Sequence, residues 1–322
     1  MKKLTRIPKP RRTMRALLCV FLSAAFASAE EARLVILHIN DTHGQTTTKR
    51  DGEYPAARIA RHVASQREQH PGAVLFLHAG DEFSRGDALT RATLGASSFA
   101  VFDAMGLDAF TPGNGEFYDG AQNLLDLAAG VKFHVLHANT KPADPSVAWL
   151  PATTVVERAG VKIGIVGGGV LTKQEGSPKL ETTPFNDVVK PLAAALTNNT
   201  DFVIALSHSG VMDDYVLARA ETGIDLIVGG HTHTVLPAPV RVSRVVGGVT
   251  NSTWVVQAGD DGKFVGRVEV VLERADETAR YSVKSITGGL DAMGPETPAD
   301  DAVTALIEAW QEKQSNKKGG VQ

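Results

Sequence analysis

The chain has 322 residues and a formal net charge of −3, from 33 basic and 36 acidic side chains. Seven of the basic residues lie within the first 15 positions, so the remainder carries a net charge of −10 and is a poor partner for polyanionic nucleic acid. The single cysteine, Cys19, belongs to the same N-terminal stretch, which excludes thiolate metal sites from the rest of the chain.

The first 29 residues have the organisation of an export signal. A basic segment precedes a short apolar run at 16–27, and the small-x-small sequence Ala27-Ser28-Ala29 follows as a cleavage site. A run of about a dozen residues cannot span a bilayer, so we expect a cleaved signal peptide at 1–29 and no membrane anchor. The sequence therefore predicts a periplasmic or secreted protein. Arg11-Arg12 leaves a twin-arginine export route as an alternative to the general one.

Beyond this leader, strands and helices alternate. The apolar runs predict strands at 34–39, 73–79, 109–111, 131–138, 153–158, 161–166, 202–206, 226–228, 253–257 and 265–272. The amphipathic patterns predict helices between them at 54–70, 88–105, 121–129, 186–197, 211–221 and 300–314, of which the helix at 186–197 is disturbed by Pro191. The alternation indicates an α/β fold with buried central strands. We expect one main domain at 30–290, then a C-terminal helix and a polar, frayed tail within 291–322.

Residues of the types that bind metals follow five of the predicted strands. Ligands of open α/β sheets gather beyond the carboxyl ends of the strands, so these side chains are expected to converge. Asp41 and His43 lie two apart, and on an extended chain such side chains point to the same side. The full set of candidate metal ligands is Asp41, His43, Asp81, Asn114, His208, His231 and His233.

Seven such side chains suit two divalent cations about 3.5–4 Å apart. Asp81 stands alone on its loop and is the natural bridge between them. Asp41, His43 and one of the paired histidines at 231 and 233 could complete one ion, and Asn114, His208 and the other histidine could complete the second. Mixed nitrogen and oxygen ligands fit Mn, Zn, Fe or Co without selecting one of them.

Each of these residues, taken singly, also has a purely structural explanation, such as a loop cap, a turn or a hydrogen-bonded buried imidazole. That explanation is the preferred one for His134 and His137. His38 lies within a strand and His78 lies three residues before Asp81, so both are expected in the core or behind the ligands.

In this order, the motifs resemble those of the calcineurin-like metallophosphoesterases, and within them the catalytic domain of 5′-nucleotidases and UDP-sugar hydrolases. The resemblance covers about residues 34–272. The matching segments are Ile39-Asn40-Asp41-Thr42-His43-Gly44, Gly80-Asp81, Gly113-Asn114-Gly115-Glu116-Phe117, His208, Gly230-His231-Thr232-His233, Gln257-Ala258-Gly259 and Gly266-Arg267.

The resemblance implies a four-layer α/β/β/α sandwich with two mixed sheets and a dinuclear metal site. Asp41, His43, Asp81 and His233 would hold the first ion, and Asp81, Asn114, His208 and His231 the second. Asp81 and Asn114 are also assigned a part in catalysis. The implied reaction is the hydrolysis of nucleotides or related phosphomonoesters, as in nucleotide catabolism, with the metals neutralising charge on the transferring phosphoryl group and activating a water.

Two departures from the family pattern affect the expected activity. Gly115 stands where the family has a histidine that donates a hydrogen bond to the transferring phosphate or to the leaving oxygen. Losing one such donor costs about 10²–10³ in rate, unless another group, for which His78 and His137 are candidates, replaces it. The chain also ends near the end of the catalytic domain, so the C-terminal domain that confers nucleotide preference is expected to be missing. A partner chain and a broader substrate range remain alternatives.

Two other functions compete with a phosphoesterase that acts on a small-molecule ester. The first is the sulfate thiohydrolase branch of the same superfamily, which acts on carrier-linked sulfur. The second is a non-catalytic metal-binding protein, which Gly115 favours. The complete ligand set argues against the second, because buried carboxylates and imidazoles are costly to keep clustered without a metal.

Overall fold

The fold was taken from a computed structural model, which describes residues 30–83, 88–170, 176, 178–220, 222–276 and 278–319. The predicted signal peptide at 1–29 lies outside the described residues. Within these ranges, no helix combines the length and the apolar composition needed to cross a membrane.

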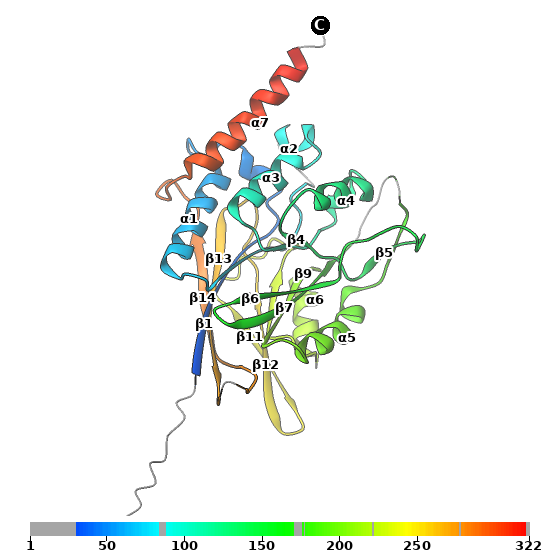
Figure 1. The fold of residues 1–322 in the computed structure, drawn as a ribbon, viewed down its shortest axis with the longest axis vertical. Coiled ribbons are helices and arrows are strands. Elements are labelled where there is room, and N and C mark those ends of the chain that lie inside the picture. The colour runs from blue at the N-terminus through cyan, green and yellow to red at the C-terminus, as the bar shows by residue number, and fades with distance from the viewer. Residues whose placement is uncertain are drawn as a thin grey trace, which may run out of the picture.

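The described residues form two six-stranded mixed sheets and a two-stranded ribbon (Figure 1). In spatial order, the first sheet contains β14 (Ser282–Ala292), β13 (Phe264–Arg274), β1 (Glu30–Ile39), β2 (Val74–His78), β3 (Ala109–Phe110) and β4 (His134–Val135). The second contains β11 (Val240–Val246), β12 (Val249–Val256), β10 (Leu226–Gly229), β9 (Phe202–His208), β7 (Val161–Gly169) and β6 (Thr153–Arg158), and the ribbon pairs β5 (Thr140–Pro142) with β8 (Leu180–Thr182). The inner strands of each sheet run parallel, whereas antiparallel strands close the edges at β13–β14, β11 and β6.

Helices cover the outer faces of both sheets (Figure 1). The α-helices are α1 (Pro55–Gln69), α2 (Ala88–Ala92), α3 (Ala96–Met105), α4 (Ala121–Ala129), α5 (Phe185–Thr197), α6 (Val211–Arg219) and α7 (Asp301–Gly319), and the 3₁₀ turns are η1 (Gln45–Thr47) and η2 (Gly115–Phe117). Helices α1, α3 and α7 pack together beside the first sheet, and α5 and α6 pack on the second. The C-terminal half of α7 projects beyond the rest of the fold.

Three hydrophobic cores separate four layers. Strand β1 shows the division, because Val35 and Leu37 face the core under α1, α3 and α7, whereas Leu34 and Ile36 face the core between the two sheets. A third core lies between the second sheet and α5 and α6. Alternation of side chains along each central strand therefore fills two cores at once. The predicted four-layer α/β/β/α sandwich is confirmed.

Several elements differ from the sequence prediction. The helix expected at 88–105 is divided into α2 and α3, because Leu94 and Gly95 both adopt positive φ, at 48° and 87°. The strand expected at 131–138 is reduced to the two residues of β4. Helix α5 continues through Pro191 instead of breaking there. Helix α7 extends to Gly319, so the tail expected to fray from residue 315 is helical up to that point.

The candidate ligands lie at one edge of this sandwich, where the parallel strands of both sheets end. Strands β1, β2 and β3 deliver Asp41 and His43, Asp81 and Asn114 from the first sheet. Strands β9 and β10 deliver the remaining three histidines from the second. The fold therefore brings together the carboxyl ends of strands from two sheets, as expected for a site in an α/β protein.

Candidate metal centre

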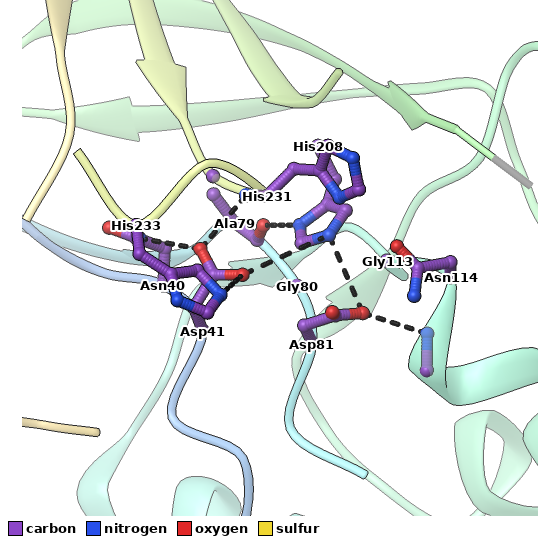
Figure 2. A network of polar contacts seen from close by, with 12 residues as sticks. Asn40, Asp41, Ala79, Gly80, Asp81, Gly113, Asn114, His208, His231 and His233 are labelled. Atoms are coloured by element: carbon purple, nitrogen blue, oxygen red, sulfur yellow. Dashed lines mark hydrogen bonds and ion pairs between the residues drawn. The ribbon is translucent and has the colours of Figure 1, made fainter. Parts of the chain in front are cut away.

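The structure gathers six of the seven candidate ligands into two groups. Figure 2 shows the side chains of five of them, Asp41, Asp81, His208, His231 and His233, close to one another. One group contains Asp41, His43 and His233, and the other contains Asp81, His208 and His231. Within each group, one ligand atom from every residue lies within 4.8 Å of the others. The seventh candidate, Asn114, directly precedes Gly115, whose backbone N–H donates to Asp81 of the second group.

The backbone of this centre is strained in a way that the amino-acid pattern did not reveal. Asp41, His43, Asp81, His231 and His233 have φ between 51° and 74°, and they are five of the nine described non-glycine residues with positive φ. Such conformations cost of order 1–3 kcal/mol each and concentrate at functional sites. Asp41 and His43 do come together as predicted, but the assumed reason is wrong. Left-handed turns bring them together, not the pleat of an extended strand.

The first group is held by close contacts between its own ligand atoms. His43 Nε2 lies 3.0 Å from His233 Nε2, and His233 Nε2 lies 3.3 Å from Asp41 Oδ1. Asp41 Oδ2 accepts hydrogen bonds from Asn40 Nδ2 at 2.7 Å and from the backbone N–H of His231 at 2.9 Å. These donors fix one oxygen of the carboxylate and leave Oδ1 facing the imidazoles.

The second group contains Asp81, the candidate bridge, together with His208 and His231. Asp81 Oδ1 lies 3.4 Å from His208 Nε2 and accepts a hydrogen bond from the N–H of Gly115 at 2.7 Å. His208 Nε2 also lies 4.0 Å from Asp41 Oδ1, so this imidazole faces carboxylates of both groups. The two groups are therefore neighbours, with a ligand atom of one group 4.0 Å from a ligand atom of the other.

Three buried atoms of the candidate ligands form no hydrogen bond with a described residue: Asn114 Oδ1, and also Asp41 Oδ1 and His208 Nε2, whose contacts are with other candidate ligands at 3.3–4.0 Å. Each belongs to a candidate ligand and is the atom that would coordinate a cation. A buried polar group left without a partner costs about 1–3 kcal/mol. Cations bound by these atoms would remove that cost, so the residues present fit a metal centre.

Hydrogen bonding also orients His208 as a ligand. Its Nδ1–H donates to the carbonyl oxygen of Ala79 at 2.6 Å, which leaves Nε2 directed at the two carboxylates. Burial disfavours a charged imidazole, but Asp81 and Asp41 raise the pKa of His208 above its ordinary value. The site thus favours positive charge at Nε2, and a divalent cation would take the place of that proton.

Two buried amides, Asn40 and Gln257, join the loops that carry the ligands. Asn40 binds Asp41 on one side and, on the other, donates to Gly259 O at 2.7 Å. Gln257 Nε2 donates to Gly230 O at 2.8 Å, and its Oε1 accepts from the backbone N–H of Thr234. Both residues lie in the matched motifs, but no local pattern indicated their partners.

Glu116 is a further supporting residue that was not predicted. Its buried carboxylate accepts four backbone N–H bonds at 2.7–3.0 Å, three from the Asp81-Glu82-Phe83 loop and one from Gly113. Burial, followed by the nearby charge of Asp81, raises the pKa of Glu116 to about 7, although the N–H groups oppose this rise. Glu116 therefore fastens the loop after β2 to the loop after β3.

The four remaining histidines considered in the sequence have structural surroundings. His134 is exposed, and His38 is buried between the sheets against Gly266. His78 contacts Thr42 Oγ1 at 2.8 Å and accepts from the N–H of Gly80, and His137 contacts Thr140 Oγ1 at 3.0 Å. Burial lowers the pKa of both His78 and His137 to about 3, so both are neutral.

Asp260 orients His233 from outside the ligand set. Its Oδ2 lies 3.5 Å from His233 Nδ1, the ring nitrogen opposite the one that faces Asp41, and its Oδ1 accepts from Lys263 Nζ at 2.7 Å. A carboxylate in this position fixes the tautomer of a metal-bound histidine and raises its basicity. Asp260→Asn is therefore expected to weaken binding of one metal equivalent by about 10–100-fold.

The measurement is a metal titration of the purified protein, and Asp261→Asn is the matched control. Asp261 also contacts Lys263, at 3.2 Å, but forms no described contact with His233. Equal metal affinities for the Asp260→Asn and Asp261→Asn variants would show that Asp260 does not support His233.

Comparison with known proteins places this geometry in context. The calcineurin-like phosphoesterase family matches residues 34–235. The 5′-nucleotidase of Mus musculus is 31% identical over 90% of this chain and 54% of its own length. The crystal structure of a 5′-nucleotidase precursor from Thermus thermophilus is similar with a TM-score of 0.74 and 26% identity, over 88% of this chain and 59% of the other.

A sulfate thiohydrolase from T. thermophilus also superposes, with a TM-score of 0.70 over 88% of this chain and 61% of the other, but at 18% identity it shows a common fold only. The chain spans about half the length of the curated relatives it matches. The family match covers more than half of the described sandwich and includes the loops that carry all seven candidate ligands. The chain therefore belongs to the calcineurin-like phosphoesterase family, as the order of its motifs predicted.

Proposed function

We propose that this protein is a phosphoesterase that uses two divalent metal ions to hydrolyse nucleotides or related phosphomonoesters. The observation that carries the proposal is the pair of neighbouring ligand groups, in which three buried ligand atoms form no hydrogen bond with a described residue. Its relatives named 5′-nucleotidases support a nucleotide as substrate. The leader sequence supports action in the periplasm or outside the cell.

In this proposal, the seven candidate ligands hold two separate metal ions. Asp41, His43 and His233 would hold the first ion, His208, His231 and Asn114 the second, and Asp81 would lie between them. When bound, the two cations would neutralise phosphate charge and lower the pKa of a water. Nitrogen and oxygen ligands fit Mn, Zn, Fe or Co.

The chain's own groups supply the geometry of the reaction. Asn40 and the N–H of His231 hold Asp41, and the N–H of Gly115 holds Asp81, so the carboxylates are fixed before substrate binds. A preorganised site does not have to reorganise as charge develops in the transition state. The strained backbone at five ligands is part of this preorganisation.

The test is metal quantitation on the mature protein, followed by a phosphate-release screen. We expect two metal equivalents per chain and phosphate release from nucleoside monophosphates. A thiosulfonate substrate tests the sulfate thiohydrolase alternative in the same assay. Two bound metals with no turnover on any ester would instead support a non-catalytic metal-binding protein, the alternative that Gly115 favours.

Metal removal is expected to destabilise the fold as well as abolish activity. Stripping the ions with a chelator leaves three buried ligand atoms, Asp41 Oδ1, Asn114 Oδ1 and His208 Nε2, with no hydrogen bond to a described residue. At a metal concentration about 100 times the Kd, binding to the folded state contributes about 2.7 kcal/mol, which for a chain of this size corresponds to a fall in Tm of roughly 5 °C on removal. Calorimetry before and after chelation, with re-addition of Mn²⁺ or Zn²⁺, measures this. An unchanged Tm would contradict metal binding at this centre.

A further inference from the structure

His78 is a buried histidine to which the proposed function gives no task. It is the last residue of β2 and lies three positions before Asp81. Its ring is fully buried, so it cannot reach a substrate phosphate to replace the donor that Gly115 lacks. The ring is neutral, so one of its nitrogens carries a proton and donates while the other accepts.

The hydrogen bonds of His78 show which nitrogen is the donor. The backbone N–H of Gly80 donates to His78 Nδ1 at 3.1 Å, so Nδ1 is the acceptor. Nε2 therefore carries the proton and donates to Thr42 Oγ1, which lies 2.8 Å away. The hydroxyl of Thr42 in turn donates to Glu82 Oε2. These groups form one hydrogen-bond chain, which runs in a single direction from Gly80 to Glu82.

This chain connects the loop after β1 to the loop after β2. Thr42 lies between Asp41 and His43, which both belong to the first ligand group. The two ends of the chain are the residues on either side of Asp81, which belongs to the second group. All three side chains of the chain are fully buried, where water cannot compete for their hydrogen bonds. The chain therefore joins the backbone of one ligand group to the backbone of the other.

The turn at Gly80 is where the chain acts on the second group. Gly80 has a φ of 85°, and a Cβ atom there would lie within 3.0 Å of both Gly113 N and His208 Nδ1. The turn thus packs directly against the loop after β3 and against an imidazole of the second group. Because His78 holds the N–H of this turn, a shift of the imidazole would move Asp81 relative to His208.

We propose that His78 is a positioning residue of the metal centre, which acts through Thr42 to set the distance between the two metal positions. Two backbone hydrogen bonds, of 2.8 and 3.0 Å, also join these loops, but both run between main-chain atoms. The imidazole adds a connection through side chains that can be cut without removing a ligand. Hydrogen-bonding partners behind a metal site typically change metal affinity or activity by about 10–100-fold. This inference rests on the two-metal part of the proposed function.

Two substitutions at position 78 separate the two bonds of the imidazole. Asparagine keeps an acceptor near the place of Nδ1 but cannot reach Thr42, whereas glutamine places an N–H near Nε2 and can still donate to Thr42. Each variant leaves a buried group without its partner, so both should lower the Tm. In Mn-loaded protein, we expect His78→Asn to change the magnetic coupling between the two Mn²⁺ ions and to lower kcat by about 10²-fold, and His78→Gln to retain the wild-type coupling.

The hydroxyl of Thr42 is tested in the same way and serves if His78→Asn does not fold. Thr42→Val keeps the branched shape but loses the hydroxyl, so it should reproduce the changed coupling and the fall in kcat. Thr42→Ser keeps the hydroxyl and should keep the coupling. Thr200→Val is the matched control, because its buried hydroxyl donates to Leu196 O at 2.8 Å, at the opposite end of β9 from His208. This control should retain the wild-type coupling and kcat.

Electron paramagnetic resonance measures the coupling without turnover, so it separates this inference from the proposed reaction. If the wild type holds a coupled Mn²⁺ pair but releases no phosphate from any ester, the proposed hydrolysis fails, and the coupling still decides the role of His78. Unchanged coupling in His78→Asn or Thr42→Val would overturn the positioning role, because the backbone bonds would then hold the spacing alone. Equal changes in His78→Asn and His78→Gln would overturn it too, since the effect would not depend on Thr42. Fewer than two Mn²⁺ ions in the wild type would overturn both proposals.

Discussion

Gly113→Ala is expected to eliminate one of the two proposed metal ions and to lower the proposed phosphoesterase activity by about 10³-fold or more, although it removes no ligand. A Cβ atom at Gly113 would lie within 3.0 Å of both Asp81 Oδ1 and His208 Nε2, closer than real Cβ atoms approach other atoms. These are two ligand atoms of the second group, so the methyl group would displace one or both of them. The φ angle of Gly113 lies outside the left-handed region, so alanine adds no backbone strain there.

Metal analysis of the purified variant measures this effect directly. Gly130→Ala is the matched control, because Gly130 also has a negative φ and its added Cβ would find its nearest neighbour, Leu127 O, at an ordinary 3.5 Å. The control should retain two metals and wild-type activity. If Gly113→Ala also binds two metals with unchanged affinity, the second ion does not lie between Asp81 and His208.

The central strands could be predicted from the sequence because each fills two cores. Strand β1 is apolar on both faces, and so are β2 and β9, which produced continuous apolar runs. The edge strands β11 and β14 were not predicted, since polar residues alternate along them and β14 contains Gly288-Gly289. Their strand conformation comes from pairing with β12 and β13, which a local pattern does not reveal.

The candidate ligands were predicted as a set, but their supporting contacts were not. Asp81 and His208 could be found because each follows a buried apolar run. The contact from Asn40 to Gly259 joins residues 219 positions apart, and the contact from Glu116 to the Asp81 N–H joins residues 35 positions apart. Such pairs exist only once distant segments have come together in the tertiary fold. The positive φ of Asp41 and His43 was likewise not predicted, because both are non-glycine residues, for which such a conformation is uncommon.

Glu116→Ala is expected to cost about 4 kcal/mol of unfolding free energy, the largest stability effect of any change considered for this site. The carboxylate accepts hydrogen bonds from Asp81, Glu82, Phe83 and Gly113, and none of these N–H groups would keep its partner in the variant. An unsatisfied buried donor costs roughly 1–3 kcal/mol, and water entering the vacated space would recover part of the sum.

Glu116→Gln should lie between the wild type and the alanine variant. The amide keeps one carbonyl oxygen, which still accepts from two of the backbone N–H groups. Its NH₂ group replaces the oxygen that accepted from the other two, and because NH₂ is itself a donor, these two N–H groups lose their acceptor. We therefore expect about half the loss seen with alanine. Urea unfolding monitored by circular dichroism measures the unfolding free energy of both variants. Glu157→Ala is the control, because Glu157 lies at an exposed position of β6, and it should change stability by less than about 0.5 kcal/mol.

The same variants test whether the loop contact also serves the metal centre. Glu116 holds the backbone of Asp81 and Gly113, so its loss frees the Asp81 carboxylate relative to His208. Metal affinity should then fall in the order wild type, Glu116→Gln, Glu116→Ala, in parallel with stability. If stability falls while metal affinity stays constant, the ligands are fixed by their own contacts, and Glu116 serves the fold alone. If neither quantity changes, the loops after β2 and β3 are held together by other interactions and the role given to Glu116 is wrong.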